Sequence, residues 1–416
     1  MPTTRDEAGE LLLGGVRLSE LARDPAIGTP AYVYDLDAMV ADATELDAAF
    51  GARPHLVCYA VKANTAGPIV RAFAARGLGA DVVSGPELMV AVACGVPARR
   101  IVYSGVAKTD AEIDLAITTG IGAIQVESVE EVSRVAARAR ACARSARVSV
   151  RINPGLDEID THAHVATGHD EAKFGVALPD VPRALDAIAA ADELALVGLA
   201  SHVGSQFTRT NEYVASAAVL FDVARSTIER GAALEFVDAG GGFGIDYGAG
   251  CPVRPADFVR ETIALQAARG LDHLTLHIEP GRALVGAHAV LIASVIQPKE
   301  SADRRWAMID AGMNDLIRPA LYQAVHRIVP LRREGGPYAP WRVVGPVCES
   351  SDDFGEHPLP RPLPRHVALL DAGAYGFTMA SRYNGRALPA EVFLSGGAVA
   401  SVTARKPAED WVSSRL

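Results

Sequence analysis

The sequence predicts an α/β protein in which a (β/α)8 TIM barrel is followed by a mainly β domain. Eight short β-branched runs alternate with alanine-rich stretches of helical character. Because eight strand–helix repeats in this order are the pattern of a closed parallel barrel, they favour a barrel over an open doubly wound sheet. From about residue 290, alternating apolar and polar runs separated by Pro- and Gly-rich turns indicate a β domain. No Gly-x-Gly-x-x-Gly motif opens the first helix, which counts against a dinucleotide-binding sheet.

The predicted elements follow this division. The strands expected in the barrel are residues 56–61, 80–83, 100–104, 123–126, 148–152, 195–203, 234–238 and 274–278. Helices are expected among them at residues 66–76, 85–93, 110–119, 129–145 and 211–230. The later strands are expected at residues 289–295, 306–309, 341–344, 366–370, 390–393 and 398–403. We therefore expect an N-terminal segment (1–35) that packs with the β domain, the barrel (36–285) and the β domain (286–416).

The composition excludes several classes of protein. A net charge of −10, with no basic stripe, argues against a nucleic-acid binder. The chain contains no run of 18 apolar residues that would indicate a membrane span. Its five cysteines are widely spaced and form no Cys-x-x-Cys pair, so we expect neither a disulfide scaffold nor a metal site, and a reducing cytoplasmic setting. The polar, acidic first residues are not those of a secretory signal.

Most of the predicted barrel strands end in groups that can do chemistry, and the carboxyl ends of the strands are where barrel enzymes gather such groups. The strand ends supply Lys62, Asp81 with Ser84, Ser104, Glu127, Arg151 with Asn153, His202 with Ser205, the glycines of 240–244, and Glu279 with Arg282. The set includes an amine for an aldehyde, a glycine-rich turn for a phosphate, a flat partner for a ring and a carboxylate for a pyridine nitrogen. These are the groups that pyridoxal phosphate requires.

Each of these residues also has an ordinary structural interpretation. Lys62 could be a solvated lysine at a strand end, and His202 could be a hydrogen-bonded core histidine. The glycines could form a plain tight turn, and Glu279 could pair with Arg282 as a structural ion pair. Together these interpretations require eight coincidences in register with the strands, so we favour a cofactor site.

Three motifs in the β region add candidate residues. Arg318 and Tyr322 are four residues apart and could reach one anion from a helical turn, although the arginine could also be solvated. Cys348 stands beside Glu349 in a non-helical stretch suited to a proton donor, or it could be a buried cysteine before an acidic loop. Tyr375 is flanked by glycines and could approach a phosphate or belong to a packed turn.

The whole set resembles the fold-type III (alanine racemase-like) pyridoxal-phosphate decarboxylases. The resemblance covers nearly the whole chain, and its motifs stand in the family's order at residues 59–64, 81–88, 202–206, 240–244, 279–282, 313–322, 348–352 and 372–376. It implies that Lys62 is the Schiff-base lysine, that His202 stacks on the ring and that Glu279 pairs with the pyridinium nitrogen. It further implies that Cys348 protonates the carbanion.

The resemblance also assigns the binding residues. The cofactor pyridoxal 5'-phosphate would contact Lys62, Asp81, His202, Ser205, Gly241, Gly242, Glu279, Gly281, Arg282 and Tyr375. The substrate would contact Arg282, Arg318, Tyr322, Glu349 and Tyr375. In the family, Cys348 and Glu349 reach into the neighbouring subunit's site, which implies a homodimer with shared active sites.

The expected reaction is loss of the α-carboxylate of an amino acid. Arg318 with Tyr322 suits a second, distal carboxylate and Glu349 a distal ammonium, so the expected substrate is meso-2,6-diaminopimelate, giving L-lysine and CO2 in lysine biosynthesis. The alternatives are a decarboxylase of another amino acid with a distal anion in a secondary-metabolite pathway, an amino-acid racemase and a non-catalytic binding protein. A racemase would lack the Cys348-Glu349 motif, and a binding protein would have lost Lys62 or Cys348.

The chain departs from the family's pattern at four places, which leaves room for altered substrate choice. The stretch from Asp353 to Arg365 is short and rich in proline. A glycine is common in the family where Ser351 stands, and an Asn-Gly pair is common near residues 106–107. Ser-Arg-Pro is common where this chain has Gly385-Arg386-Ala387.

Overall fold

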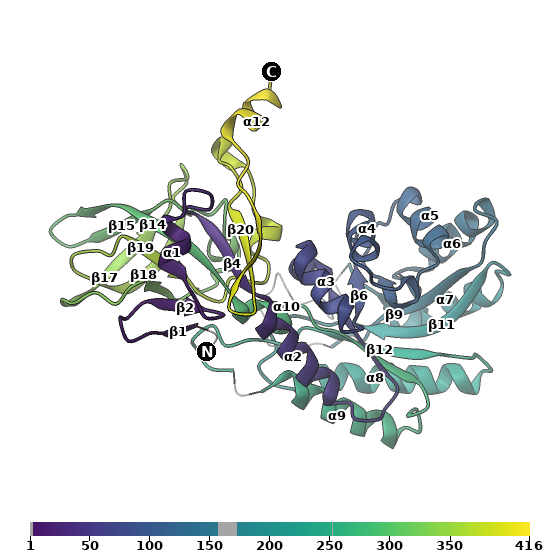
Figure 1. The fold of residues 1–416 in the computed structure, drawn as a ribbon. Coiled ribbons are helices and arrows are strands. Elements are labelled where there is room, and N and C mark those ends of the chain that lie inside the picture. The colour runs from purple at the N-terminus through teal and green to yellow at the C-terminus, as the bar shows by residue number, and fades with distance from the viewer. Residues whose placement is uncertain (1–2, 157–172, 252) are drawn as a thin grey trace. The chain divides into compact units, whose positions relative to one another are not determined.

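A computed structural model describes residues 3–156, 173–251 and 253–416, and the chain forms two compact units (Figure 1). The barrel unit consists of Asp42–Ile245 and Cys251–Ala283. The sheet unit consists of Met1–Ala41, Asp246–Gly250 and Leu284–Leu416. No helix in the described ranges is both long and apolar enough to cross a membrane.

The barrel unit confirms the predicted parallel barrel. Its eight strands are β5 (His55–Ala60), β6 (Gly79–Val82), β7 (Ile101–Tyr103), β8 (Ala123–Val126), β9 (Ala146–Asn153), β11 (Leu194–Ser201), β12 (Phe236–Gly241) and β13 (Thr275–Glu279). Each pairs in parallel with the next, and the sheet closes because β13 pairs with β5 and β8 pairs with β9. A two-residue strand, β10 (Val176–Ala177), pairs in parallel with the end of β9. All the carboxyl ends of the barrel strands therefore meet at one edge.

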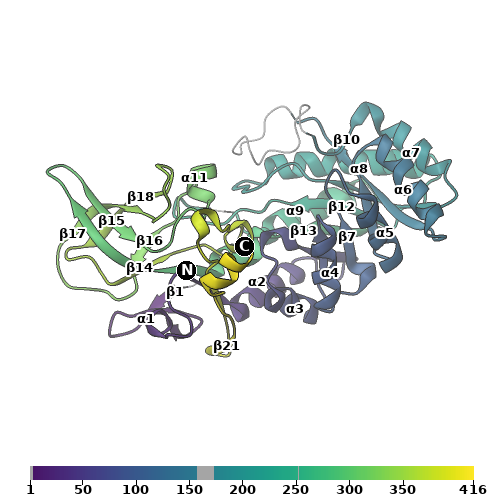
Figure 2. The same ribbon diagram turned by 90° about the horizontal axis from the view of Figure 1, so that it is seen from above.

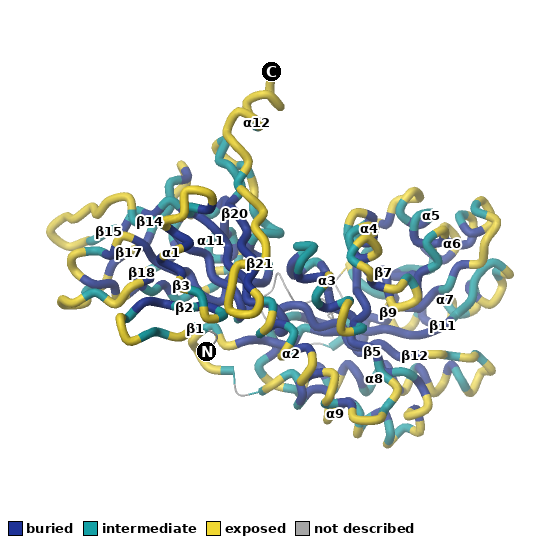
Figure 3. Tube along the Cα trace, in the orientation of Figure 1, coloured by how far each residue is buried: buried dark blue, intermediate teal, exposed yellow. Residues whose placement is uncertain are grey.

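The barrel helices lie outside these strands (Figure 2). They are α3 (Gly67–Ala75), α4 (Gly85–Ala93), α5 (Asp110–Thr119), α6 (Val129–Ala141), α7 (Val181–Ala189), α8 (Asn211–Glu229) and α9 (Pro255–Ala268). Several begin at a capping side chain that satisfies an otherwise unpaired N–H group. The Thr109 hydroxyl accepts from Glu112 N while Glu112 accepts from Thr109 N, and Ser128 caps α6. The buried strands and exposed outer helix faces in Figure 3 follow from this amphipathic pattern.

The sheet unit is built on a sheet with the order β18-β17-β15-β14-β4-β20-β21. In chain order these strands are β4 (Ala31–Asp35), β14 (Ala289–Glu300), β15 (Arg305–Ile309), β17 (Tyr338–Val344), β18 (Asp353–Pro360), β20 (Ala390–Ser395) and β21 (Ala398–Thr403). β19 (His366–Leu369) pairs with β14 and with β16 (Ile328–Pro330). The N-terminal strand β4 lies between β14 and β20. Residues far apart in the sequence thus share one core, which includes Val33, Ile292 and Val392.

Smaller elements complete the two units. They are β1 (Thr3–Arg5), β2 (Leu11–Leu13), β3 (Val16–Arg17), α1 (Leu18–Arg23), α2 (Leu36–Ala48), α10 (Arg282–Val285), α11 (Arg318–Tyr322) and α12 (Ala408–Ser413). The sequence patterns did not predict β18, which lies in a proline-rich stretch. β18 is an edge strand, where a missing N–H removes no ladder bond on the solvent side, so Pro358 and Pro360 are tolerated.

The buried carboxyl of Glu391 makes the stability of the sheet unit depend on pH. Glu391 is 5% exposed and accepts a hydrogen bond from the Tyr34 hydroxyl at 3.0 Å. Burial raises the pKa of Glu391 to about 7 from its ordinary value of 4.5. The carboxyl of Glu391 holds its proton more tightly in the folded protein than in the unfolded chain. Its contribution to the free energy of unfolding is therefore fully present below pH 4.5 and is lost as the pH rises through 7.

Glu391→Gln should therefore stabilise the protein at alkaline pH, because the amide keeps an acceptor for Tyr34 and cannot ionise. We expect a gain of about 3 kcal/mol at pH 8.5 and little change at pH 4.5. Thermal unfolding of the variant and the wild type at both pH values measures this difference. An equal change in unfolding temperature at both pH values would show that the stabilisation does not come from removing a buried charged carboxylate.

Candidate active site

Lys62 is held at the carboxyl edge of the barrel by a buried carboxylate. Strand β5 ends at Ala60, one residue before the predicted end, and Lys62 lies in the short 3-10 turn Val61–Ala63 that follows the strand. Its Nζ lies 2.5 Å from Oδ2 of Asp81, which is fully buried in β6. The Ser104 hydroxyl donates to the other oxygen of Asp81. Two contacts fix the carboxylate, so the amine has a defined position despite being 30% exposed.

A second buried carboxyl, Glu279, ends β13 and retains a proton. Glu279 is 5% exposed and Asp238 is fully buried, and the Gln125 amide nitrogen lies 3.2 Å from an oxygen of each. Burial, and then the charges of Asp238 and Asp81, raise the pKa of Glu279 well above its usual range. Burial also raises the pKa of Asp238, to about 6. The Glu279 carboxyl is therefore a neutral acid until a cationic or basic partner arrives.

His202 is a neutral ring with a defined proton position. It follows β11, and its Nδ1 lies 3.2 Å from the backbone N of Gly241 and 3.8 Å from Oε2 of Glu279. Since the Gly241 N–H donates to Nδ1, the imidazole proton resides on Nε2. Burial, followed by the charges of Arg151 and Lys62, lowers the pKa of His202 well below its usual value. The ring can therefore stack on an apolar or aromatic surface without carrying charge.

The glycine-rich turn after β12 packs against the segment after β11. Gly242 has φ +93°, and a Cβ there would collide with the carbonyl oxygen of Gly204. The N–H of Phe207 donates to the Gly242 carbonyl at 2.9 Å. The N–H groups of Gly240 and Gly241 already have acceptors in Asp238 and His202. A phosphate is therefore expected to bind the other backbone N–H groups of this turn.

The turn after β13 brings Arg282 to the same edge. Gly281 packs against β5 and its following turn, because a Cβ there would lie 2.9 Å from Ala63 Cβ. Arg282 is 7% exposed, and its Nη2 donates to the Ser205 hydroxyl at 3.0 Å. Ser205 and Arg282 were both predicted at strand ends, and the structure joins them by this bond.

In the sheet unit, the predicted helical turn is present as α11, which carries Arg318 and Tyr322. Arg318 is 6% exposed, so it is not the solvated arginine of the alternative interpretation. Tyr375 has φ +55° in a turn where the neighbouring Gly376 packs on Tyr32, since a Cβ at Gly376 would lie 2.7 Å from the Tyr32 hydroxyl. The turn that carries Tyr375 is therefore closely packed.

Cys348 and Glu349 occupy an exposed loop, and each of them is held by a hydrogen bond. The Cys348 N–H donates to Asn384 Oδ1 at 3.0 Å, and the Tyr383 hydroxyl donates to Glu349 Oε1 at 2.6 Å. Cys348 is exposed, which excludes the buried cysteine of the alternative interpretation. Beneath the loop, the buried Asp352 accepts from the N–H groups of residues 313 and 347, each at 2.6 Å. This carboxylate joins the loop to the segment that leads into α11.

Three residues of these arrangements were not predicted as site residues: Gln125, Asp238 and Asp352. Asp238 ends the predicted strand 234–238, two residues before the glycine turn, and Asp352 ends the predicted Cys348 motif, so both lay close to a recognised signal. Gln125 is a polar residue inside an apolar run, which is itself a signal of a buried polar contact.

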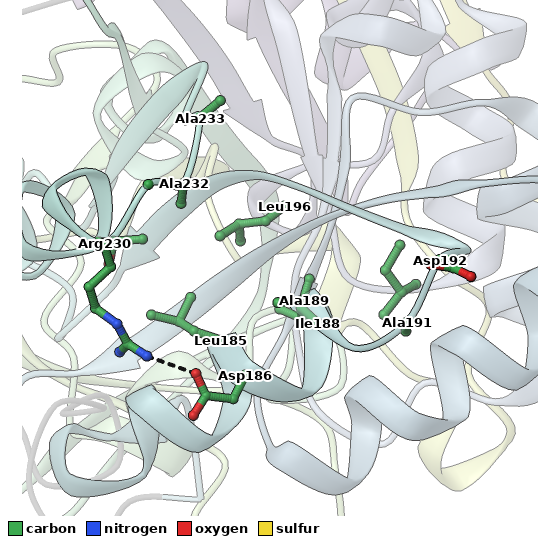
Figure 4. A pocket seen from close by; sticks show the side chains of 13 residues that line it. Leu185, Asp186, Ile188, Ala189, Ala191, Asp192, Leu196, Arg230, Ala232 and Ala233 are labelled. Carbon is green, nitrogen blue, oxygen red and sulfur yellow. Dashed lines mark hydrogen bonds and ion pairs between the residues drawn. The ribbon is translucent and has the colours of Figure 1, made fainter.

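A separate pocket of about 530 Å³ lies at the opposite end of the barrel strands (Figure 4). It is lined by the last turns of α7 and α8, the residues that follow these helices and the start of β11, and it contains the ion pair of Asp186 with Arg230 at 2.7 Å. None of the predicted site residues lines it. The amino-terminal end of a barrel serves stability more than catalysis.

Comparison with known proteins agrees with this geometry. Residues 36–286 match the family described as pyridoxal-dependent decarboxylase, pyridoxal binding domain. The chain belongs to this family. A diaminopimelate decarboxylase of Zymomonas mobilis is 39% identical over 97% of this chain and 96% of its own. The resemblance stated from the sequence is thereby confirmed, and the protein is a pyridoxal-phosphate-dependent carboxy-lyase.

The fold of this chain is also similar to that of solved structures. The diaminopimelate decarboxylase of Helicobacter pylori complexed with L-lysine is 34% identical, with a TM-score of 0.90 over 96% of this chain and 99% of that one. The enzyme of M. jannaschii in co-complex with L-lysine is 32% identical, with a TM-score of 0.92 over 100% of this chain and 97% of that one. The fold-type III assignment is therefore confirmed.

The residues at the carboxyl edge fit pyridoxal phosphate. Lys62 offers an amine in a fixed position, and His202 offers an uncharged flat ring. Glu279 offers a proton for a pyridine nitrogen, because its pKa is raised by burial. Gly242 lets the turn expected to hold the phosphate pack against the segment after β11, because a Cβ there would collide with the Gly204 carbonyl oxygen. The donor set thus matches the aldehyde, ring and phosphate of one cofactor.

Proposed function

We propose that this protein decarboxylates meso-2,6-diaminopimelate to L-lysine and CO2. The observation that carries the proposal is that Lys62, paired with the buried Asp81, and the protonated acid Glu279 stand at the carboxyl edge of one barrel. Relatives similar over nearly the whole chain are diaminopimelate decarboxylases, and two solved ones hold L-lysine.

Bound pyridoxal phosphate supplies an electron sink for the electron pair that loss of CO2 leaves at Cα. Lys62 provides the amine that holds the cofactor's aldehyde, and Asp81 positions that amine. Glu279 would keep the pyridine nitrogen protonated and pair with it, and His202 would stack on the ring. Gly242 and the turn around it, with Tyr375, would hold the phosphate, and Ser205, Gly241, Gly281 and Arg282 would line the rest of the cofactor site.

The substrate is recognised at the end far from the reacting carbon, and it is protonated at the reacting carbon, Cα. Arg318, with Tyr322, meets the distal carboxylate, because a planar guanidinium can hold a carboxylate by two parallel bonds. Glu349 takes the distal ammonium, and Arg282 and Tyr375 also contact the substrate. The Cys348 thiol then delivers a proton to Cα. The Tyr383 and Asn384 contacts described above would fix this pair of residues.

We further propose a cytoplasmic homodimer in which Cys348 and Glu349 serve the partner's site. Both residues lie in an exposed loop, which suits a role outside their own subunit. Residues 36–285 would bind the cofactor, as the family match over 36–286 supports. Residues 1–35 and 286–416 would form the second domain, as the pairing of β4 with β14 and β20 supports.

Replacing Arg318 tests the proposed substrate. A charge-assisted pair in a partly desolvated pocket is worth roughly 2–5 kcal/mol when one partner is truncated. Arg318→Ala should therefore lower kcat/KM for meso-diaminopimelate by about one and a half to three and a half powers of ten. Arg318→Lys should recover only part of this loss, because an ammonium lacks the planar fork.

The low activity on lysine or ornithine, which carry no carboxylate far from the reacting carbon, should change little in Arg318→Ala. Steady-state CO2 release from each amino acid makes the comparison, with the exposed Arg332→Ala as a matched control. An equal loss on all amino acids would make Arg318 structural and refute the proposed role.

A further inference from the structure

The Arg318 guanidinium is bound on one edge and covered on one face within the sheet unit. Its Nη1 lies 2.8 Å from Nε2 of His326. Its central carbon lies 4.7 Å from the ring centroid of Tyr247. The Tyr247 and His326 rings are 5.5 Å apart in an edge-to-face arrangement. Arg318 and His326 are 6% and 2% exposed, so solvent does not compete strongly for these contacts.

The hydrogen-bond partners of His326 define its tautomer. A guanidinium has only donors, so Nε2 of His326 must accept from Arg318 and carries no proton. The proton therefore resides on Nδ1, which donates to the Leu370 carbonyl at 2.8 Å. An imidazolium would place an N–H and a positive charge against the guanidinium. The arrangement thus requires a neutral imidazole with its proton on Nδ1.

This imidazole connects Arg318 to a rigid part of the sheet unit. The N–H of Leu370 donates to the Arg327 carbonyl at 2.9 Å. Arg327 in turn binds Asp371, with Nη2 2.7 Å from the buried carboxylate. The segment that carries His326 is therefore tied to the end of β19 by backbone and side-chain bonds. Arg318 inherits this fixed position through His326.

We propose that His326 is a positioning residue that sets the orientation of Arg318 toward an anionic group at the far end of the substrate. The inference rests on the proposed function and adds a determinant of substrate affinity that does not touch the substrate. An arginine whose plane is already fixed loses less side-chain freedom when it binds a carboxylate, so it binds more tightly. The effect should appear in KM and not in kcat.

His326→Gln and His326→Asn separate positioning from general packing. Glutamine can place an oxygen near Nε2 and accept from Arg318, whereas asparagine replaces Nδ1 and leaves the arginine without its acceptor. A lost acceptor for a buried charged donor costs about 1–3 kcal/mol. His326→Asn should therefore raise KM for meso-diaminopimelate by about 5- to 150-fold with kcat changed less than about threefold. His326→Gln should recover most of the affinity.

Two inhibitors that differ by one carboxylate give the sharpest comparison. L-Lysine and 1,5-diaminopentane have the same amines and chain, and only lysine offers Arg318 a carboxylate. In His326→Asn, the inhibition constant of lysine should rise as KM does, while that of the diamine should stay within about threefold of wild type. His357→Gln is the matched control, because His357 is also buried and also bonds a backbone carbonyl.

Nitrogen NMR of histidine-labelled protein tests the tautomer without any activity. The resonance pair that disappears in His326→Gln should show a protonated Nδ1 and an unprotonated Nε2. A proton on Nε2, or equal weakening of lysine and the diamine, would overturn the inference. Failure of the proposed function would look different, because wild-type enzyme would then release no CO2 from meso-diaminopimelate. If the wild type is active and the KM of His326→Asn is unaltered, this inference is refuted while the proposed function stands.

Discussion

Lys62→Ala should abolish decarboxylation, with a loss of three powers of ten or more in kcat, about 4 kcal/mol of transition-state stabilisation. The reason is that alanine removes the amine that Asp81 holds 2.5 Å away at the barrel edge. Borohydride treatment of the wild-type holoenzyme should attach the cofactor to Lys62, and a peptide map should locate it there. The variant should lose this covalent link and the absorbance that accompanies it.

Lys299→Ala is the matched control, since Lys299 is exposed in the sheet unit. It should keep full activity and the label on Lys62. A reduced cofactor found on another lysine, or full turnover by Lys62→Ala, would end the assignment.

Cys348→Ala should lose about two to four powers of ten in kcat, which is the usual contribution of a positioned proton donor. Cys142→Ala should be close to wild type, because Cys142 lies at the end of α6 and not in the predicted site. The stronger test mixes two inactive proteins, Lys62→Ala and Cys348→Ala, under conditions that exchange subunits. If Cys348 serves the partner's site, each heterodimer carries one intact site.

Random exchange of equal amounts makes half of the dimers mixed, so about a quarter of the wild-type activity should return. Native mass spectrometry would establish that heterodimers are present. A mixture rich in heterodimers but without activity would show that each site is built from a single chain.

The barrel could be predicted because each of its strands has a local sequence pattern that is typical of a buried strand. Runs such as 123–126 are short, apolar and flanked by helical stretches, and the structure reproduces that strand as β8. The ends of these runs also revealed Lys62 and Glu279, since the closed sheet places all carboxyl ends together. Predicted boundaries erred by a few residues; the helix expected to reach residue 145 ends at Ala141, because Cys142 and the turn after it leave the helix.

Other parts of the fold and of the site depend on contacts between residues that are far apart in the sequence, and no local sequence pattern predicts such contacts. Gln125 and Asp238 are 113 residues apart and meet only because the barrel closes. The link between Arg318 and His326 crosses the end of α11, where Gln323 turns the chain with φ +54°. β18 was missed because its prolines outweigh its alternation, and only its place at the sheet edge makes them acceptable.

The central claim is that the substrate is meso-diaminopimelate, and one assay tests it most directly. Purified holoenzyme should be incubated with a panel of amino acids labelled at the carboxyl groups, including meso-diaminopimelate, lysine, ornithine and arginine, and the released CO2 measured. We predict release from meso-diaminopimelate with formation of an equal amount of L-lysine, and at least a hundredfold lower kcat/KM for the amino acids without a distal carboxylate, about 2.7 kcal/mol of discrimination. No release from meso-diaminopimelate, with efficient release from ornithine or arginine, would contradict the account.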